Sequence, residues 1–324
     1  MLDLIFIVLG LAGLLWSSDK FVEGAAAIAK HAGMSPFIIG MTIVSLGTSA
    51  PEIVVSLIAS VTGSGELAVG NALGSNITNI GLVLGLTLMI RAMTIDASAT
   101  KRELPQMVAV TLLAGALMSD HLLSIADGLI LLSSLALFLF LLARRDSTLV
   151  PVADNTKHST TLLNAWIAFI VGLVLLVVSS RLLVVGAVNI ATALGVSELV
   201  IGLTIVAIGT SLPELAASVM SALKGHADIA IGAIVGSNVF NLLVVLAIPG
   251  IFGPLVLDVS VMDRDWTATL LLTGILMGFA WIAYARTLSR TQGSGELGRA
   301  AGVVLVGMYT AYIGLLITYP DFTW

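Results

Sequence analysis

Long apolar runs separated by short polar stretches extend through the whole chain. About ten of these runs approach the ~20 residues that a helix needs to cross a bilayer. Backbone polar groups in lipid must be paired within the protein, so continuous runs of this length predict helices rather than the strands of an open sheet. The expected spans are 2–30, 36–62, 66–90, 103–119, 122–143, 162–192, 198–222, 228–250, 265–285 and 300–319.

The polar interruptions of these runs occur twice in the same order. Residues 39–52 read IGMTIVSLGTSAPE and residues 201–214 read IGLTIVAIGTSLPE, a shift of 162 positions in a chain of 324. Downstream, GNALGSNITN at 70–79 is repeated as GAIVGSNVFN at 232–241. Because each half holds an odd number of helices, the second half must enter the membrane in the opposite direction. The pattern predicts an all-α multi-pass membrane protein with ten transmembrane helices in two inverted five-helix repeats.

The repeat also sets the expected organisation of the chain. The first five-helix repeat is expected at 1–143, with its motif at 39–85. The second is expected at 162–324, with its motif at 201–247. The polar segment 144–161 between them is expected to be a cytoplasmic linker, and it is too short to hold a regulatory domain.

Composition supports the membrane class, and charge predicts an orientation. Hydrophobic residues make up 58% of the chain and charged residues 10%, whereas soluble domains have roughly 25% charged residues. Basic residues favour the cytoplasmic side of membrane proteins. If the N-terminus lies outside, the inner loops hold Lys30, Arg91, Lys101, Arg102, Arg144, Arg145, Lys157, Lys224, Arg286, Arg290 and Arg299. Arg264 alone then falls in an outer loop, so both termini are expected outside the cytoplasm.

The second predicted span carries a polar stripe around one acid. Ser45, Ser49, Glu52 and Ser56 are spaced four, three and four residues apart, so they share one face of a helix. Pro51 lacks an amide proton and clashes with the preceding turn, so a kink or break is expected there. We expect the break to free carbonyl oxygens near Ser45.

The seventh predicted span repeats this stripe with Ser211, Glu214 and Ser218 beside Pro213, while Ala207 replaces Ser45. Serine and threonine in membrane helices are usually packing residues, and a lone acid can serve as a structural partner. Two acids at equivalent places in the same motif instead favour an ion site.

A second wall of oxygen atoms is expected from the third and eighth predicted spans. Asn71, Ser75 and Asn79 share one face of the third span, and Ser237 and Asn241 repeat it in the eighth. Carboxylate, hydroxyl, amide and carbonyl oxygens suit calcium and sodium. The chain has no cysteine and only scattered histidines, which argues against copper or zinc.

No nucleophile–histidine–acid set, phosphate loop or basic aromatic stripe is present, which disfavours an enzyme and a nucleic-acid-binding protein. GSGELG at 293–298 matches a dinucleotide-binding pattern. It is expected to be a short loop between spans with no strand before it, so nucleotide binding is not expected.

The motifs GTSAPE at 47–52, GTSLPE at 209–214, GSNITN at 74–79 and GSNVFN at 236–241 resemble the α-repeats of the calcium/cation antiporter superfamily. Prokaryotic sodium/calcium exchanger-like proteins are the most similar, and the resemblance covers essentially the whole chain. It implies ions enclosed by helices 2, 3, 7 and 8. The implied ligands are Glu52, Glu214, Thr48, Ser49, Thr210, Ser211, Ser75, Ser237, Asn79 and Asn241, with the carbonyls of Ser45 and Ala207.

The resemblance implies a secondary antiporter of a prokaryotic plasma membrane that exchanges sodium for calcium by alternating access, with no cofactor and no obligate protein partner. Some family members, including potassium-cotransporting ones, carry Asp where this chain has Asn241, so potassium dependence is not expected. Two alternatives stay open. A proton-coupled exchanger would use the same glutamate pair, and a channel would need no counter-ion.

Overall fold

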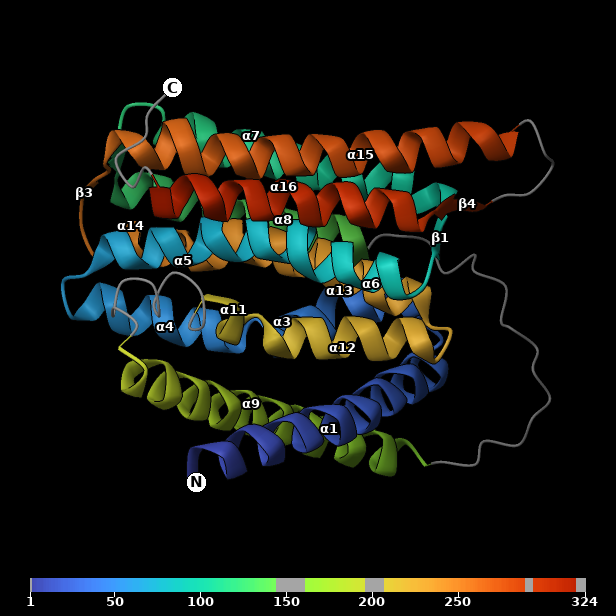
Figure 1. Ribbon diagram of the computed structural model, residues 1–324. Coiled ribbons are helices and arrows are strands. Elements are labelled where there is room, and N and C mark those ends of the chain that lie inside the picture. Colours follow the sequence, from blue (N-terminus) through green and yellow to red (C-terminus); the bar gives the residue numbers. More distant parts are fainter. Residues whose placement is uncertain (1, 144–160, 196–206, 289–293, 319–324) are drawn as a thin grey trace.

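Helices form almost all of the computed structural model, which describes residues 2–143, 161–195, 207–288 and 294–318. The helices run along one common direction in stacked layers (Figure 1). π-Helical turns, labelled η, interrupt several of them. The elements of the first half are α1 (Leu2–Ala32), α2 (Pro36–Ile39), η1 (Gly40–Val44), α3 (Ser45–Thr48), α4 (Ala50–Val61), α5 (Gly65–Thr78), η2 (Asn79–Leu84), α6 (Gly85–Ile90), β1 (Met93–Asp96), η3 (Ala99–Glu103), α7 (Leu104–Met118), β2 (Leu122–Leu123) and α8 (Ile125–Ala143).

The second half repeats this order. Its elements are α9 (Leu162–Ala193), α11 (Ala207–Thr210), α12 (Leu212–Leu223), α13 (Ala227–Phe240), η5 (Asn241–Val245), α14 (Ala247–Ile251), β3 (Leu255–Val256), η6 (Val261–Trp266), α15 (Thr267–Leu288), β4 (Ser294–Leu297) and α16 (Arg299–Thr318). Equivalent helices run in opposite directions in Figure 1: α1 starts at the end of the bundle where α9 finishes, and α4 and α12 diverge from the middle. The halves are therefore inverted copies, as the repeat predicts.

The described residues contain seven helices long and apolar enough to cross a membrane, or eight when the bent pair Pro36–Thr48 and Ala50–Val61 is taken as one span. Of the other two predicted spans, one is α7, a shorter helix of 15 residues. The span predicted at 198–222 begins outside the described residues and ends in α12. The linker predicted at 144–161 also lies outside them except for Thr161, which caps α9.

Two short antiparallel strand pairs join the ends of helices, which the helical prediction did not include. β1 pairs with β4, and β2 pairs with β3. β4 consists of Ser294–Leu297, so the GSGELG segment, predicted to be a loop, is mainly a strand. It still lies between two helices, α15 and α16, without the strand–turn–helix order of a dinucleotide site. Pairing with a segment about 200 residues away gave no local sequence signal.

α1 and α9 form a tightly packed pair on one side of the bundle (Figure 1). Two glycines permit this approach. A Cβ added to Gly24 would lie 2.5 Å from the Phe169 nitrogen, and one added to Gly172 would lie 2.5 Å from the Phe21 nitrogen. The Phe21 and Phe169 rings stack with centroids 4.7 Å apart. Most other contacts of this pair are with the broken helices, so it lies beside the region that the sequence marks as the ion site.

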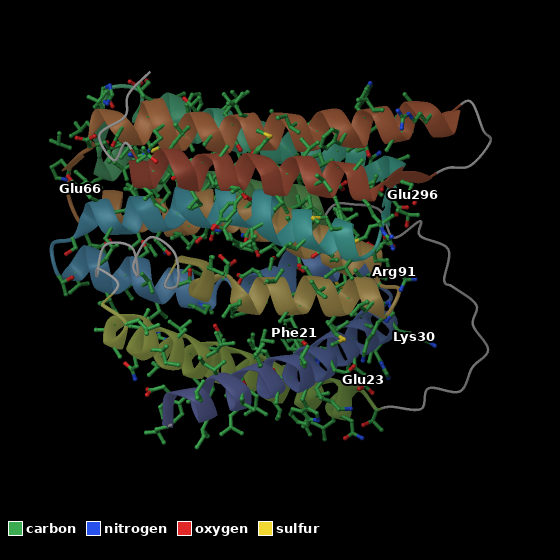
Figure 2. All side chains as sticks on the ribbon, in the orientation of Figure 1. Phe21, Glu23, Lys30, Glu66, Arg91 and Glu296 are labelled. Carbon is green, nitrogen blue, oxygen red and sulfur yellow. The ribbon has the colours of Figure 1, made fainter. Side chains whose placement is uncertain are left out.

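Basic side chains gather at one end of the helices. Lys30 and Arg91 lie at the end opposite Glu66 in Figure 2. Arg91 donates to the Leu223 carbonyl, and Lys224 forms an ion pair with Asp19 at 2.7 Å. Lys30, Arg91 and Lys224 all belong to the set that the sequence places in the inner loops, so their common position agrees with the predicted charge bias.

Candidate cation-binding site

Each polar stripe lies across a broken helix. α3 ends at Thr48 and α4 begins at Ala50, and the two parts bend by 44°. Ser49 between them has φ −82° and ψ 2°, and Ser211 between α11 and α12 has φ −91° and ψ 6°. The proline two residues later cannot donate a helical hydrogen bond. The break predicted from Pro51 and Pro213 is therefore confirmed in both copies.

The Ser45 carbonyl differs from the expectation. It accepts a hydrogen bond from the Ser49 amide at 2.9 Å, so the proline does not free it from the helix. The Thr48 hydroxyl also donates to this carbonyl, at a longer distance of 3.4 Å, so a cation bound here would compete with that weak contact for the second lone pair. The equivalent residue, Ala207, is the first residue of α11.

Both glutamates begin a helix in the interior of the protein. Glu52 is 1% exposed in the first turn of α4, and Glu214 is 4% exposed in the first turn of α12. A helix N-terminus favours negative charge. Ser49 Oγ lies 3.5 Å from Glu214 Oε1, and Thr48 also contacts this carboxylate. The Oε2 atom of each glutamate has no hydrogen-bond partner among the described residues.

Four further candidates come from α5, α13 and the π-helical turns that follow them. Ser75, Asn79, Ser237 and Asn241 are all buried. Asn79 is the first residue of η2 and Asn241 the first of η5. Sequence reasoning did not foresee these turns, which are frequent at functional sites because they redirect a side chain within a helix.

Unpartnered polar atoms concentrate in this set of residues. Buried polar groups in proteins are almost always hydrogen-bonded, so each exception needs an explanation. Among the described residues, the atoms of the candidate set without a partner are Glu52 Oε2, Glu214 Oε2, Asn79 Oδ1, Ser211 Oγ, Ser237 Oγ, Asn241 Nδ2 and Asn241 Oδ1. All but the Asn241 amide nitrogen are oxygens, which suits hard cations. No group of three or more His, Cys, Asp or Glu in the described part of the chain lies close enough to hold a metal, so the carboxylate pair needs help from neutral oxygens.

Two members of the polar faces have other contacts. Asn71 donates from Nδ2 to the Glu52 carbonyl at 3.1 Å, which fixes the broken helix against α5. Ser56 donates to the Val245 carbonyl at 2.7 Å. Both side chains therefore connect helices within the core.

A cavity of about 440 Å³ extends from this region to one end of the bundle. Its inner wall includes Ser75 and Thr210, and its outer wall includes Arg264, Asp265 and Tyr312. A second cavity of about 180 Å³ lies beside α9 and also reaches Thr210. Thr210 is half-buried, which agrees with a place where two cavities meet.

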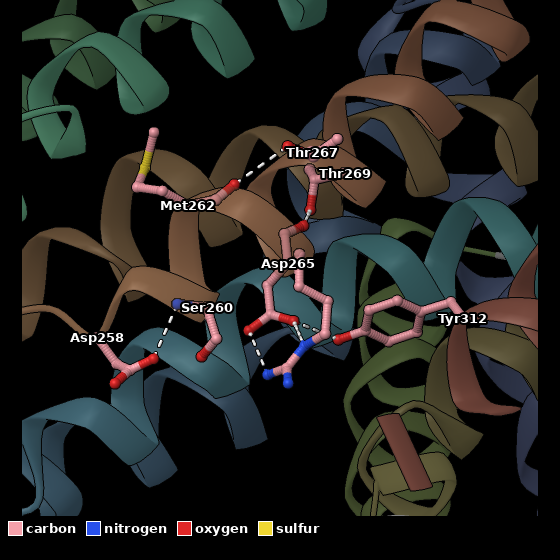
Figure 3. Close-up of polar contacts among 8 residues, drawn as sticks. Asp258, Ser260, Met262, Asp265, Thr267, Thr269 and Tyr312 are labelled. Atoms are coloured by element: carbon pink, nitrogen blue, oxygen red, sulfur yellow. Dashed lines mark hydrogen bonds and ion pairs between the residues drawn. The ribbon is translucent and has the colours of Figure 1, made fainter. Parts of the chain in front are cut away.

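The outer wall contains a buried polar cluster that the sequence did not reveal (Figure 3). Arg264 Nε donates to Asp265 Oδ1 at 2.7 Å, and the Tyr312 hydroxyl donates to the same oxygen at 2.9 Å. Arg264 was expected in a loop, but it lies in η6 and is largely buried by this ion pair. Nearby and outside the spans, hydrogen bonds from Ser260 lower the pKa of Asp258.

Comparison with known proteins assigns the family. The profile described as "Sodium/calcium exchanger protein" matches residues 2–144 and 164–318. This chain belongs to the sodium/calcium exchanger family. The match covers both halves, so the two repeats predicted from the sequence are both parts of the family's architecture. Family membership makes the chain an integral multi-pass membrane transporter, not an enzyme.

Several known proteins are similar to this chain along nearly their whole length. The "Putative antiporter CaxA" of Alkalimonas amylolytica is 44% identical over 89% of this chain and 93% of that protein. "Inner membrane protein YrbG" of Escherichia coli is 38% identical over 96% of this chain and 95% of that protein. The solved structure of the sodium–calcium exchanger NCX_Mj, soaked with Na⁺ and Ca²⁺, superposes with a TM-score of 0.83 at 31% identity, covering 98% of this chain and 99% of that one.

Proposed function

We propose that this protein is a sodium/calcium antiporter that works by alternating access. The observation that carries the proposal is that two buried carboxylates, one from each repeat, have unpartnered oxygens, as do buried hydroxyl and amide groups of the same repeated motifs. The proposed ligand set is Glu52, Glu214, Thr48, Ser49, Ser75, Asn79, Thr210, Ser211, Ser237 and Asn241, with the carbonyls of Ser45 and Ala207. Similarity to the sodium–calcium exchanger NCX_Mj supports sodium and calcium as the exchanged ions.

Charge balance explains why such a site would exchange ions rather than leak them. One Ca²⁺ neutralises the Glu52 and Glu214 carboxylates. An empty site would leave two buried charges of the same sign without compensation, which is strongly unfavourable. The empty protein is thereby discouraged from changing its access side, as obligatory exchange requires.

The same charges predict electrogenic transport. Three Na⁺ in place of one Ca²⁺ leave one net positive charge in the site. A tenfold inward sodium gradient supplies about 1.4 kcal/mol per ion, and one charge gains about 2.3 kcal/mol per 100 mV. The total of about 6.5 kcal/mol would sustain a calcium ratio between ~10⁴ and 10⁵.

The proposed location is the prokaryotic plasma membrane, which agrees with the name of the E. coli relative. We further propose that the basic end of the bundle, which holds Lys30 and Arg91, faces the cytoplasm. The cavity at Arg264, Asp265 and Tyr312 then opens to the outside.

The deciding experiment is ⁴⁵Ca²⁺ uptake into proteoliposomes under imposed sodium, potassium or proton gradients. Uptake driven by an outward sodium gradient and accelerated by a membrane potential of the matching sign is the expected result. Uptake that follows a pH gradient and ignores sodium would instead identify a proton-coupled exchanger with the same carboxylate pair. Uptake without any counter-ion would identify a channel.

A further inference from the structure

The two inverted halves differ in conformation although their sequences repeat. In the second half, a Cβ at Gly232 would overlap the Phe37 carbonyl oxygen, because α13 packs directly against α2. At Gly70, the equivalent residue of α5, a Cβ would meet no atom of the described residues within 4 Å. α2 therefore closes α13 at this point, while residues 198–201, the repeat equivalent of α2, lie outside the described part of the chain.

Side-chain exposure differs between equivalent residues of the two halves. Leu67 on α5 is 61% exposed and lines the larger cavity. Its equivalent on α13, Ile229, is 0% exposed. An exchanger with two inverted repeats can reach the opposite access state by exchanging the conformations of its halves. Residue 67 would then become buried and residue 229 exposed.

A pair of equivalent serines follows this asymmetry. Ser56 on α4 donates its hydroxyl proton to the Val245 carbonyl of η5 at 2.7 Å. Ser218 on α12 is equally buried and lies on a helix packed against η2, where Val83 is the equivalent of Val245. The Ser218 hydroxyl has no hydrogen-bond partner among the residues described.

A pair of equivalent asparagines shows the same pattern at the crossing of α5 and α13. Asn76 donates from Nδ2 to the Asn238 carbonyl at 3.2 Å, so two residues related by the repeat are in contact, as expected at the pseudo-two-fold axis. Asn238 instead donates to Ile234 within its own helix at 2.7 Å. In this conformation the cross-helix bond is therefore donated by Asn76, while the Asn238 amide bonds within its own helix.

A third pair lies where α1 and α9 meet the broken helices. Ser180 on α9 donates across to the Gly209 carbonyl of α11 at 2.8 Å. Its equivalent on α1, Ser18, donates to Leu15 in its own helix at 3.0 Å. Gly47 of α3 is the equivalent of Gly209 and would be the corresponding acceptor.

We propose that these three pairs form a hydrogen-bond switch that sets the balance between the two access states. On passing to the opposite state, each cross-helix bond is transferred to the repeat partner. The new bonds run from Ser218 to the Val83 carbonyl, from Asn238 to the Asn76 carbonyl and from Ser18 to the Gly47 carbonyl. The inference rests on alternating access in the proposed function but not on which ions are carried.

The exchange keeps the number of cross-helix bonds constant, so these bonds do not favour the free energy of either access state in the native protein. A small difference between states is what allows bound ions to decide the population. Replacing one member of a pair breaks this balance. Ser56→Ala removes a bond from the present state only, and it also removes an orphaned hydroxyl from the opposite state. Ser218→Ala does the reverse.

The absence of cysteine from the chain permits a direct test. Leu67→Cys and Ile229→Cys serve as reporters in the full-length protein purified in detergent, where a maleimide reaches both ends of the molecule. Labelling rates are measured with and without Na⁺ and Ca²⁺. Ser56→Ala should slow labelling at residue 67 and speed it at residue 229, and Ser218→Ala should do the opposite. One buried hydrogen bond corresponds to changes of about 2- to 10-fold.

Changes in the same direction for both serine variants, or no change in either, would overturn the switch. The two variants control for each other, because a general loss of packing would change the labelling rates at residues 67 and 229 in the same direction. Asn76→Ala and Asn238→Ala supply an independent pair with the same opposed signs. Reciprocal labelling in a protein that lacks sodium-driven calcium flux would support the switch and refute the proposed ions. Sodium-driven calcium flux without reciprocal labelling would support the proposed ions and refute the switch.

Discussion

At the scale of single residues, Glu52 and Glu214 combine burial with incomplete hydrogen bonding. A buried carboxylate normally has an ion-pair partner or several donors, since desolvation of an unpaired charge is costly. Each acid has one carboxylate oxygen without a partner among the described residues, and Glu214 otherwise has side-chain contacts from Ser49 and Thr48. In the proposed function, a transported cation supplies the compensating positive charge.

Replacing either acid by its amide should therefore stop calcium transport. Glu52→Gln and Glu214→Gln keep the side-chain size and one oxygen, but each leaves a divalent ion facing a single negative charge in a desolvated site. We expect sodium-driven ⁴⁵Ca²⁺ flux to fall by about 100-fold or more in each variant. Glu66→Gln is the matched control, since Glu66 also lies in the first turn of a helix but is exposed. Near-normal calcium flux in Glu52→Gln or Glu214→Gln would show that the replaced glutamate does not bind the transported ion.

Asn241 tests which ions the site selects. Asn241→Asp adds a third acid beside Glu52 and Glu214, and repulsion between like charges favours proton uptake by the group. Calcium flux of the variant should therefore fall as the pH drops from 9 to 6, whereas the native protein should vary less. Flux is measured across this range with and without potassium, and the exposed Asn164→Asp is the control. Superimposable profiles for Asn241→Asp and the native protein would show that Asn241 does not line the site.

At the scale of elements, the broken helices and the π-helical turns place the candidate side chains. The break at Ser49 begins a new helix directly before Glu52, which directs a helix N-terminus toward the acid. The turns η2 and η5 begin at Asn79 and Asn241, and π-helical turns are frequent at functional sites. Each device occurs in both repeats, so the proposed site would have oxygens from both halves.

The contact between α1 and α9 depends on small residues. Gly172→Ala would force a methyl group against the Phe21 backbone and separate the helices. We expect an overpacking cost of about 1–3 kcal/mol, measured as a lower melting temperature in detergent.

Gly274→Ala is the matched control for this change, because Gly274 is also helical and a Cβ there meets no described atom within 4 Å. Alanine has the higher helix propensity, so the control should melt at the same temperature or slightly above it. Equal melting temperatures for both variants would show that the α1–α9 interface is not closely packed.

At the scale of the whole molecule, inversion of the repeats gives two halves that are alike in sequence and unlike in conformation. α13 is packed along its length, while α5 borders a cavity that leads to the candidate site. A single set of oxygens can thereby be open to one side of the membrane and closed to the other. Exchange of these two conformations is the simplest route to alternating access.

Orientation in the membrane is tested with cysteines at opposite ends of the molecule. Val150→Cys lies in the predicted cytoplasmic linker, and Glu66→Cys lies at the end away from the basic residues. In intact cells, a membrane-impermeant maleimide should label residue 66 and not residue 150. Labelling at residue 150 alone would reverse the proposed topology, and labelling at both would refute the expected number of crossings between them.

The sequence by itself determined the membrane class, the inverted repeat, the helix breaks and the residue types of the site. These features follow from local rules: apolar length sets a span, proline removes a hydrogen bond, and helical spacing places Ser49 beside Glu52 on one face. The motifs that recur 162 residues apart also showed which residues of the two halves are equivalent, because a duplication can be read without any structure.

Only the tertiary structure decided which polar groups keep a partner and which do not. Ser56 and Ser218 are equivalent in sequence, yet only Ser56 has a hydrogen bond. The cluster of Arg264, Asp265 and Tyr312 and the pairing of β1 with β4 likewise join segments far apart along the chain. The physical reason is that repeated sequences specify the same local structure, while the packing of one half against the other breaks their symmetry.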